Sequence, residues 1–229
     1  MCVRYTFHRP DEALAAIAAV LAFKLAPLSE WAKPRFNVTL AQTMPVVSVG
    51  SDGPEVRGMI PFYEHEQPKR KLLPNAKAET AATLSAFKHA VAKRRCLVPA
   101  NGYYEWQSLG KLKLPHLFTL MDEKPFAFAG IWEPAEEDMP ATYAILTTGP
   151  NNLVASIHNR MPVILTPETM PRWLGTEPLS EDAFRALTQP LPADRMQERP
   201  VNRYVSNSRN EGPQCHAAPE AEPPELELC

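Results

Sequence analysis

Hydrophobic residues along this chain gather in short runs separated by turn-forming residues, a pattern that predicts many short β-strands. The clearest pair is Pro45–Val49 and Glu55–Ile60, which the turn Gly50-Ser51-Asp52-Gly53 separates. The same pattern predicts extended segments at Arg95–Pro99, Tyr103–Gln107, His116–Met121, Phe126–Trp132, Thr142–Thr148, Pro162–Leu165 and Arg199–Asn207.

Helices are predicted at intervals between these runs, where alanine and leucine recur behind residues that cap helices. We expect them over Asp11–Lys24, Thr80–Lys93, Thr166–Gly175 and Ser180–Thr188. Short strands with a few helices and no βαβ alternation indicate an α+β fold. We predict a single domain over residues 1–210, built on a mixed β-sheet or open barrel with a few flanking helices.

Composition supports an ordinary globular protein with an unusual end. With 229 residues, of which 45% are hydrophobic, the chain can bury a core. The net charge of -2 is uneven, because Glu211–Cys229 holds five glutamates and no lysine or arginine. We expect this acidic, proline-rich tail, residues 211–229, to be disordered. The body keeps a modest positive excess, which does not by itself require nucleic acid.

The four cysteines form no CxxC pair, which favours free thiols in a reducing compartment. The apolar run Ala13–Phe23 is too short to span a bilayer, and no convincing signal-cleavage site follows it. The six histidines are scattered, so the sequence predicts no metal site. We expect a cytoplasmic protein without a cofactor or a membrane partner.

Cys2 directly follows the initiator methionine and is small enough for Met1 to be removed. A free Cys2 would carry an α-amine beside its thiol. This pair condenses with an aldehyde through an imine to a stable thiazolidine ring. The amine titrates near pH ~7.7–8.0, so a useful neutral fraction exists at cellular pH. A cysteine at this position is often accidental, and its weight depends on the residues that accompany it.

Three further residues are candidates for proton transfer or substrate contact. Glu105 lies among aromatic residues after the Asn101-Gly102 turn, where burial would raise its pKa, although an exposed edge strand is an equal alternative. His158 lies on a loop before a strand and is either a proton shuttle or a surface residue. Asn75 precedes a helix and either caps it or binds a sugar or phosphate oxygen.

Taken together, these stretches resemble the SRAP family, the SOS-response-associated peptidase-like proteins that shield abasic sites. The similarity spans residues 2–207, and the block around Glu105 is its most specific part. The matching segments are Met1-Cys2 with Arg4, Arg35–Val38, Gly58–Pro61, Asn75–Thr80, Arg95–Trp106, Ala129–Trp132 and Ile157–Val163.

The resemblance implies a protein of the DNA-damage and SOS response that binds single-stranded or junction DNA. In this family the N-terminal cysteine forms a covalent protein–DNA cross-link with the aldehyde of an abasic site. The resemblance also implies removal of Met1, which explains the peptidase label, and a possible lyase activity. We expect a cytoplasmic monomer that joins the nucleoid when it binds DNA.

By position, the resemblance assigns Cys2 as the nucleophile and Asn75 as the residue that orients its amine or the sugar. Glu105 would be the general acid–base, and His158 would help to open the sugar ring. Residues expected to contact DNA include a stacking wedge at Phe62 or Tyr63 and the basic runs Lys69–Lys71 and Lys93–Arg95. The remaining expected DNA contacts are Arg4, Asn37, Lys77 and Arg160.

Several positions depart from the family pattern. Val3 replaces a glycine beside the nucleophile, and Arg57 stands where a tryptophan is usual. Asn159 replaces an aspartate after His158, which removes a carboxylate that could tune the imidazole. The departures spare the four assigned catalytic positions, so we expect an activity with altered rate or DNA preference.

Two other functions remain open from the sequence. An N-terminal-nucleophile peptidase would use the Cys2 thiol to cleave proteins without DNA. A non-catalytic reader of modified or single-stranded nucleic acid would keep its whole activity when Cys2 is replaced. The basic and aromatic residues fit DNA better than a peptide cleft.

Overall fold

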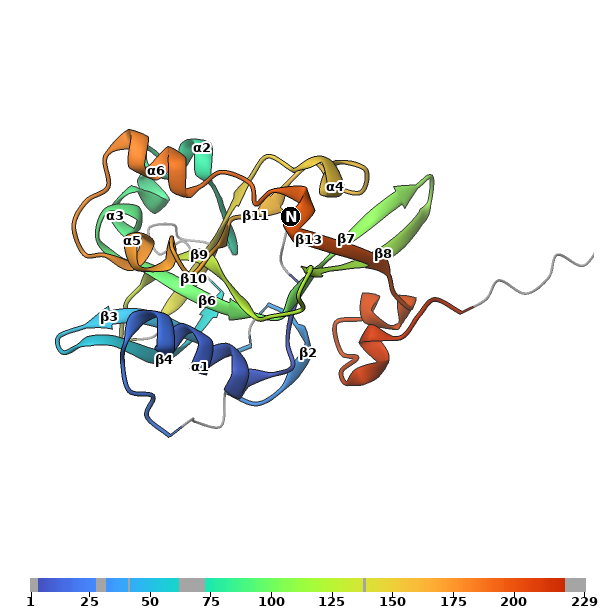
Figure 1. Ribbon diagram of the computed structural model, residues 1–229, viewed down its shortest axis with the longest axis horizontal. Helices are drawn as coiled ribbons and strands as arrows, with labels where there is room; N and C mark the ends of the chain where they lie inside the picture. Colours follow the sequence, from blue (N-terminus) through green and yellow to red (C-terminus); the bar gives the residue numbers. More distant parts are fainter. Residues whose placement is uncertain (1–3, 28–31, 41, 62–72, 138, 221–229) are drawn as a thin grey trace, which may run out of the picture.

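The computed structural model describes residues 4–27, 32–40, 42–61, 73–137 and 139–220. Its strands form two sheets (Figure 1). The first has the order β13-β8-β7-β1-β2. Its strands are β1 (Tyr5–Phe7), β2 (Arg35–Val38), β7 (Gly102–Leu109), β8 (Leu112–Leu120) and β13 (Met196–Pro200).

The second sheet is mixed and partly closed on itself. It follows the order β11-β10-β4-β3-β6-β9-β12, and a further pairing of β10 with β9 closes the path into a barrel. Strand β10 runs parallel to β4 and β5 and antiparallel to β9 and β11. The strands are β3 (Met44–Gly50), β4 (Gly53–Pro61), β5 (Asn75–Lys77), β6 (Arg95–Ala100), β9 (Phe126–Glu133), β10 (Thr142–Thr148), β11 (Met161–Pro162) and β12 (Ile164–Leu165).

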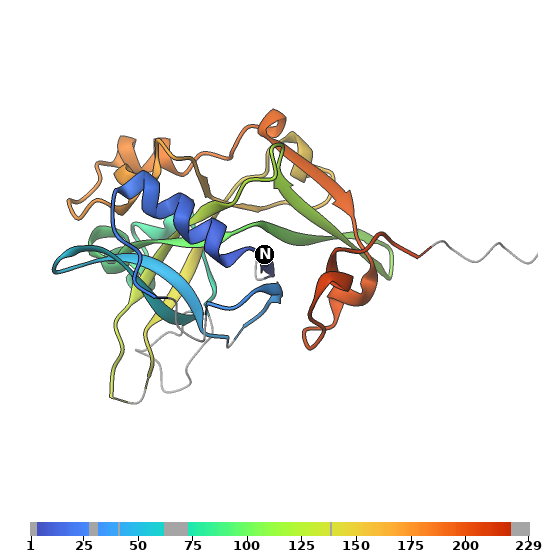
Figure 2. The ribbon, with the colours of Figure 1, turned by 60° about the horizontal axis from the view of Figure 1, so that its bottom comes forward.

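Helices flank the barrel and shield its central strands. Helix α1 (Pro10–Leu21) contacts β6, β9 and α5 (Met170–Leu174), and α3 (Ser85–Lys93) also covers β6 and β9 (Figure 2). Strand β6 is buried along its whole length, as expected for a strand covered on both faces. The remaining helices are α2 (Ala78–Ala81), α4 (Asn152–Ala155) and α6 (Glu181–Leu187). The structure therefore confirms the predicted α+β class and its mixed, partly closed sheet.

Close packing explains one glycine between the barrel strands. A Cβ at Gly130 on β9 would lie 2.7 Å from the Cys96 Sγ on β6. The Trp173 indole of α5 donates to the carbonyl oxygens of both residues, at 2.9 Å to Cys96 and 3.2 Å to Gly130. A larger residue at Gly130 would separate the two strands on which α5 rests.

The structure corrects several sequence predictions. The helix expected over Thr80–Lys93 is two helices, α2 and α3, separated by residues 82–84. The extended segment expected at Arg199–Asn207 continues a strand only to Pro200 and then forms the 3-10 turn η2 (Arg203–Ser206). Strands β1 and β5 were not predicted, because each has only three residues and gains its order from neighbouring strands.

The tail boundary expected at residue 211 also needs correction. Residues 213–216 form the 3-10 turn η3 (Pro213–His216), in which Cys215 is fully buried. A second hydrophobic cluster joins Cys215 to Tyr104, Leu117, Val201 and Val205. We name residues 201–216 the C-terminal clasp, since they pack against β2, β7 and β8. Apolar burial explains why residues 211–216 are ordered although they begin the tail expected to be disordered.

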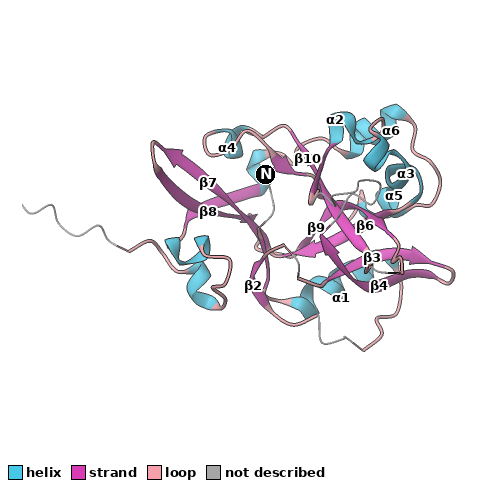
Figure 3. Cartoon of the chain, turned by 180° about the vertical axis from the view of Figure 1, so that it is seen from behind, coloured by secondary structure: helices cyan, strands magenta, loops and turns pink. Residues whose placement is uncertain are grey.

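Seen from behind, β7 and β8 extend beyond the barrel, and the clasp lies beside them (Figure 3). Through the described ranges, none of the helices has both the length and the apolar character needed to cross a membrane.

Candidate functional site

Strands β7, β8 and β13 form a ribbon in the first sheet, and Glu105 lies on β7, on the face of this ribbon that turns toward the barrel. Its neighbour two positions earlier, Tyr103, stacks on Phe118 of β8 at a centroid distance of 4.9 Å. Since alternate residues of a strand share one face, Glu105 also lies on this buried face. Only 3% of its surface is exposed. The alternative of an exposed carboxylate on an edge strand is therefore wrong.

A close approach at the start of β7 fixes this geometry. A Cβ at Gly102 would lie 2.8 Å from the Phe118 backbone oxygen, so only glycine allows the two strands this contact. The Asn101 side chain, next to it, accepts a hydrogen bond from the Arg9 backbone amide at 3.0 Å. The Asn-Gly turn thus seats β7 against β8 and α1.

The Glu105 carboxyl has an unusual proton affinity. Burial raises its pKa from 4.5 to about 7, and the positive charge of the amino terminus opposes this shift. Near neutral pH the group is therefore divided between its acid and its carboxylate. Such a carboxyl can both donate and accept a proton, which is the property that general acid–base catalysis requires.

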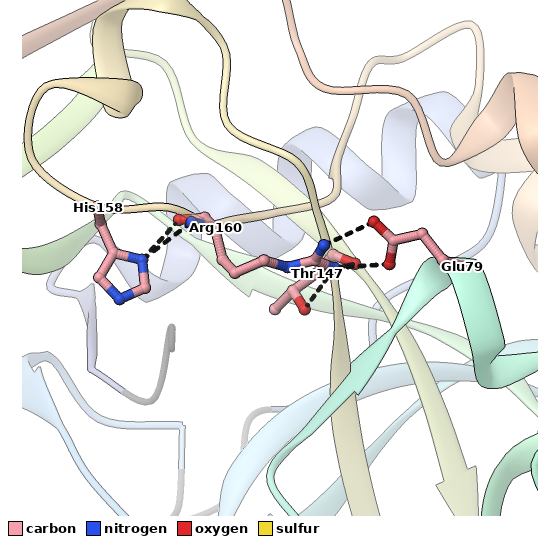
Figure 4. A network of polar contacts seen from close by, with 4 residues as sticks. All are labelled: Glu79, Thr147, His158 and Arg160. Carbon is pink, nitrogen blue, oxygen red and sulfur yellow. Dashed lines mark hydrogen bonds and ion pairs between the residues drawn. The ribbon is translucent and has the colours of Figure 1, made fainter.

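His158 lies on the loop between α4 and β11 and faces Glu105. Its Nε2 is 3.8 Å from the Glu105 Oε2, too long for a hydrogen bond but close enough for an ion pair. Its Nδ1 lies 3.0 Å from the carbonyl oxygen and 3.1 Å from the amide nitrogen of Arg160 (Figure 4). Burial is the main cause that lowers its pKa. The backbone thus orients the ring without the carboxylate that Asn159 replaces.

Asn75 begins β5, the short strand that pairs with β10. The Asn75 Nδ2 donates to the Ile145 carbonyl oxygen at 3.4 Å. The same strand pair places Lys77, which is exposed, opposite Thr147. Asn75 is therefore part of a strand and not the helix cap that the sequence left open.

Arg160 links this strand pair to the His158 loop (Figure 4). Its guanidinium donates to both carboxylate oxygens of Glu79, at 2.6 and 2.9 Å, and to the Thr147 carbonyl oxygen at 2.5 Å. Because the Arg160 side chain is only 16% exposed, these contacts hold the loop against β10. They also engage both terminal nitrogens of the guanidinium, which a DNA phosphate would otherwise contact.

Two expected DNA contacts are instead structural. Asn37 is 1% exposed, and its Nδ2 donates to the carbonyl oxygens of Val205, Asn207 and Asn210, all in the clasp. Its Oδ1 accepts a hydrogen bond from the Arg4 Nε at 2.9 Å. Asn37 therefore has no free donor for a phosphate, and its prediction as a DNA contact is corrected.

Arg4 is held from several sides. Its guanidinium donates to Asn37 and to the Val205 carbonyl oxygen and lies 5.5 Å from the centre of the Trp106 ring. The Arg4 carbonyl oxygen accepts from the Tyr104 amide at 3.0 Å. Strand β1 thus runs beside β7, with Tyr5 opposite Tyr103, and Arg4 lies one position from Glu105 along this pairing.

The other assigned residues divide into three cases. Cys2, Phe62, Tyr63 and Lys69–Lys71 lie outside the described residues. Arg95, expected in a basic groove, is 4% exposed and donates to carbonyl oxygens that include those of Val91 and Trp173, so that expectation is wrong. Lys77 remains an exposed cation beside the site.

Sequence reasoning missed a polar pair on the same face of the ribbon. His116 on β8 lies directly opposite Glu105, and its Nδ1 hydrogen-bonds the Glu198 carboxylate on β13. The His116 side chain is 11% exposed and that of Glu198 is 21% exposed. The signal that could have found the pair is the alternation of β8 and β13, which places His116 and Glu198 on the face of the sheet that carries Glu105.

No group of three or more potential metal ligands comes together anywhere in the described part of the chain. The site therefore offers proton-transfer groups: a buried carboxyl that titrates near neutrality, an imidazole beside it and a second imidazole across the strand pair.

Comparisons with known proteins agree with this arrangement. A family model described as SOS response associated peptidase (SRAP) matches residues 1–208. The chain is 34% identical over 191 residues to the abasic site processing protein YoqW of Bacillus subtilis, covering 79% of this chain and 84% of that protein. It is 31% identical over 220 residues to the abasic site processing protein YoaM of the same species, covering 92% and 95%.

The chain is also similar to a more distant relative and to a solved structure. The abasic site processing protein YedK of Escherichia coli is 28% identical over 219 residues, which cover 93% of this chain and 97% of that protein. A crystal structure of a protein from Bacteroides thetaiotaomicron matches with a TM-score of 0.78 at 24% identity, covering 95% of this chain and 99% of that one. This similarity to a solved structure supports the fold alone.

Proposed function

Because the chain belongs to the SOS response associated peptidase (SRAP) family, we propose that it processes abasic sites in DNA, the activity named for its relatives. Its substrate is single-stranded or junction DNA, on which it acts as a cytoplasmic monomer. One observation carries the proposal. The buried Glu105, with a pKa of about 7 and His158 at 3.8 Å, lies beside the strand that leads back to the amino terminus.

The reaction that this site supports begins with ring opening. An abasic deoxyribose is mostly a cyclic hemiacetal, and only its open form carries an aldehyde. Opening removes the proton of the C1′ hydroxyl and adds one to the ring oxygen. His158, whose pKa burial lowers, accepts the first proton, and the acid form of Glu105 supplies the second.

The following steps join the protein to the sugar. After removal of Met1, the neutral Cys2 amine adds to C1′, and loss of one water leaves an imine. Glu105, a carboxylate after ring opening, takes a proton from the added amine and returns it to the departing hydroxyl, so that the water carries away both amine protons. The Cys2 sulfur then adds to the imine carbon, and its proton passes to the nitrogen, which closes the thiazolidine. Aldehyde and aminothiol thus give thiazolidine and one water.

Other residues position the two reactants. Asn75 orients the Cys2 amine or the sugar oxygen, and its place on β5 fits this role because β10 holds the strand rigidly. Lys77 is exposed beside it and contacts a phosphate. Removal of Met1 accounts for the peptidase in the family's name, and a lyase activity would follow if the imine allowed β-elimination of the 3′ phosphate.

Mass spectrometry and denaturing gels test the proposal. Protein that lacks Met1 should form an SDS-resistant adduct with an abasic oligonucleotide, whose mass is the sum of the two molecules minus one water. Cys2→Ala should abolish the adduct, Cys229→Ala should retain it, and a tetrahydrofuran abasic analogue, which has no aldehyde, should give none.

The alternatives predict different results. Absence of an adduct from wild-type protein lacking Met1 would refute the proposal. Peptide cleavage that needs Cys2 and proceeds without DNA would favour the peptidase, and unchanged binding and activity after Cys2→Ala would favour the non-catalytic reader.

A further inference from the structure

His158, the residue assigned to open the sugar ring, lies on a loop between two short elements. The loop begins after α4, which ends at Ala155, and leads into β11, which has only two residues. The His158 amide donates to the Val154 carbonyl oxygen at 2.9 Å, which anchors the first half of the loop. The second half contains Arg160, whose side chain reaches β10 (Figure 4). The position of the imidazole therefore depends on what fixes Arg160.

The Arg160 backbone holds one edge of the imidazole. The His158 Nδ1 lies 3.0 Å from the Arg160 carbonyl oxygen and 3.1 Å from its amide nitrogen, while Nε2 is 3.8 Å from the Glu105 Oε2. A neutral imidazole carries one proton, and only the form with this proton on Nδ1 leaves Nε2 able to accept another. In this form Nδ1 donates to the Arg160 carbonyl oxygen. Burial lowers the pKa of His158, and the hydrogen bond with the Arg160 backbone opposes this shift.

The Arg160 side chain is fixed by a carboxylate from another element. Glu79 of α2 accepts from both terminal nitrogens, at 2.6 and 2.9 Å, and Thr147 of β10 accepts from one of them. Two parallel N–H···O contacts hold a guanidinium in one orientation. The hydrogen bond from Arg160 lowers the pKa of Glu79, which keeps the acceptor ionised at neutral pH. Because the Glu79 side chain is 53% exposed, the pair contributes more to geometry than to stability.

Glu79 belongs to the segment that carries two other residues of the proposed site. Strand β5, with Asn75 and Lys77, is followed directly by α2, and Lys77 lies opposite Thr147 of β10. Thr147 also binds the Arg160 guanidinium. One segment thus places the residue assigned to orient the reactants and, through Arg160, the residue assigned to open the sugar.

We propose that Glu79 is a positioning residue for ring opening, which holds His158 in its base form through the side chain and backbone of Arg160. The inference rests on the proposed function. In the step it supports, Nε2 accepts the proton of the C1′ hydroxyl, and the bond between C1′ and the ring oxygen breaks as the C1′ carbonyl forms. Glu105 gives its proton to the ring oxygen. Nδ1 keeps its proton throughout, so the Arg160 carbonyl oxygen stabilises both the base and the imidazolium.

A role confined to ring opening distinguishes two substrates. Natural abasic DNA must open its hemiacetal before the Cys2 amine can add. An acyclic aldehyde, in which hydrogen replaces the C4′ hydroxyl, has no ring to open. Loss of Glu79 should therefore slow the first reaction and leave the second unchanged, whereas a damaged fold would slow both.

The test compares single-turnover rates of adduct formation for these two oligonucleotides at saturating DNA. Glu79→Ala should react with natural abasic DNA about fivefold more slowly than wild type, and with the acyclic aldehyde at the wild-type rate. Glu79→Gln keeps one acceptor oxygen and the shape of the side chain, so its rate with natural abasic DNA should lie between those of Glu79→Ala and wild type. Neither variant should bind unreactive abasic DNA more weakly, because the charge of Arg160 remains.

A double-variant cycle tests whether Arg160 carries the effect. In an Arg160→Met background, Glu79→Ala should cause no further slowing with natural abasic DNA, since the connection to His158 is already lost. Glu181→Ala, which breaks the exposed Arg185 pair on α6, is the control and should match wild type with both substrates.

Three results would overturn the inference: a wild-type rate of Glu79→Ala with natural abasic DNA, equal slowing with both substrates, or full additivity in the cycle. Each of them, beside a wild type that forms adducts, would leave the proposed function standing. A wild type that forms no adduct with either substrate would refute the proposed function and this inference with it.

Discussion

The two faces of the five-stranded sheet contrast in how their polar groups are matched. On the face that meets the clasp, Asn37 donates to three carbonyl oxygens and Arg4 is held by Asn37, Val205 and Trp106. On the face that meets the barrel, Glu105 and His158 are 3.8 Å apart, and burial shifts the pKa of each toward its neutral form. Polar groups whose hydrogen bonds are all made fix the backbone, whereas groups with shifted pKa values stay available for proton transfer.

The contrast shows how one sheet both stabilises the fold and holds the reactive groups. The clasp face gains stability from matched hydrogen bonds and from the apolar cluster around Cys215. This stability offsets the cost of keeping a carboxyl buried on the other face. The reactive groups on one face of the sheet therefore depend on the stability that the opposite face supplies.

The largest expected effect comes from the reactive face. Glu105→Gln removes the titratable proton with little change in shape, so adduct formation should slow by about 10²–10⁴-fold. Single-turnover kinetics with an abasic oligonucleotide measure this rate. Adding Gln107→Glu to this variant places a carboxyl two positions further along β7, and the double variant should react no faster than Glu105→Gln alone. A Glu105→Gln rate within a factor of three of wild type would remove Glu105 from the mechanism.

The same substitution should raise stability at alkaline pH. Because the folded pKa of about 7 lies above the ordinary value of 4.5, the unfolded chain loses its proton first, and wild-type stability falls as the pH rises from 4.5 through 7. Glu105→Gln avoids this loss and should be more stable than wild type by about 3 kcal/mol at pH 8. Urea unfolding at pH 5 and pH 8 checks this. An equal difference at both pH values would contradict it.

The clasp face should respond in the opposite way. Asn37→Leu leaves carbonyl oxygens of the clasp and the Arg4 guanidinium without their partner, so the free energy of unfolding should fall by about 2 kcal/mol. The fall should be the same at pH 5 and pH 8, because no titration is involved. Asn152→Ala, at an exposed position, serves as the control for urea unfolding. A loss confined to one pH would show that the two faces are not separate.

The smallest effect is expected at the rim of the site. Glu79→Gln removes the charge of a half-exposed carboxylate that pairs with Arg160, which should cost less than about 1 kcal/mol of stability. The substitution leaves the positive charge of Arg160 without its carboxylate beside Lys77. Unreactive abasic DNA should therefore bind about twofold more tightly at low salt. Glu181→Gln, which breaks the exposed Arg185 pair on α6, should leave DNA binding unchanged. Equal gains from both variants would assign the effect to net charge alone.

Much of this arrangement could be predicted from sequence because the signals are local. The β3–β4 hairpin follows from two apolar runs around a glycine turn, with Gly53 at φ +111°. Ser180 caps α6 as predicted, through a hydrogen bond from the Ala183 amide at 3.2 Å. The burial of Glu105 was one of two predicted alternatives, since the aromatic residues around it allowed either face.

The rest depends on partners distant in the chain. From the sequence we predicted that one amide, Asn37, and two cations, Arg4 and Arg95, contact DNA. In the structure, carbonyl oxygens far along the chain accept hydrogen bonds from these three side chains. The composition of residues 211–229 predicts disorder, yet the burial of Cys215 against Tyr104 orders the first part of this tail. His116 faces Glu105 only through the β7–β8 register, which the sequence does not specify.

The hydrogen bond from Arg4 to the Val205 carbonyl oxygen joins residues 201 positions apart. A growing chain on the ribosome cannot close this contact until residue 205 has been synthesised. Strand β1 can pair with β2 and β7 much earlier, but the Arg4 guanidinium takes its final partner only when the clasp arrives. A side chain near the start of the chain is thus among the last to be fixed in place.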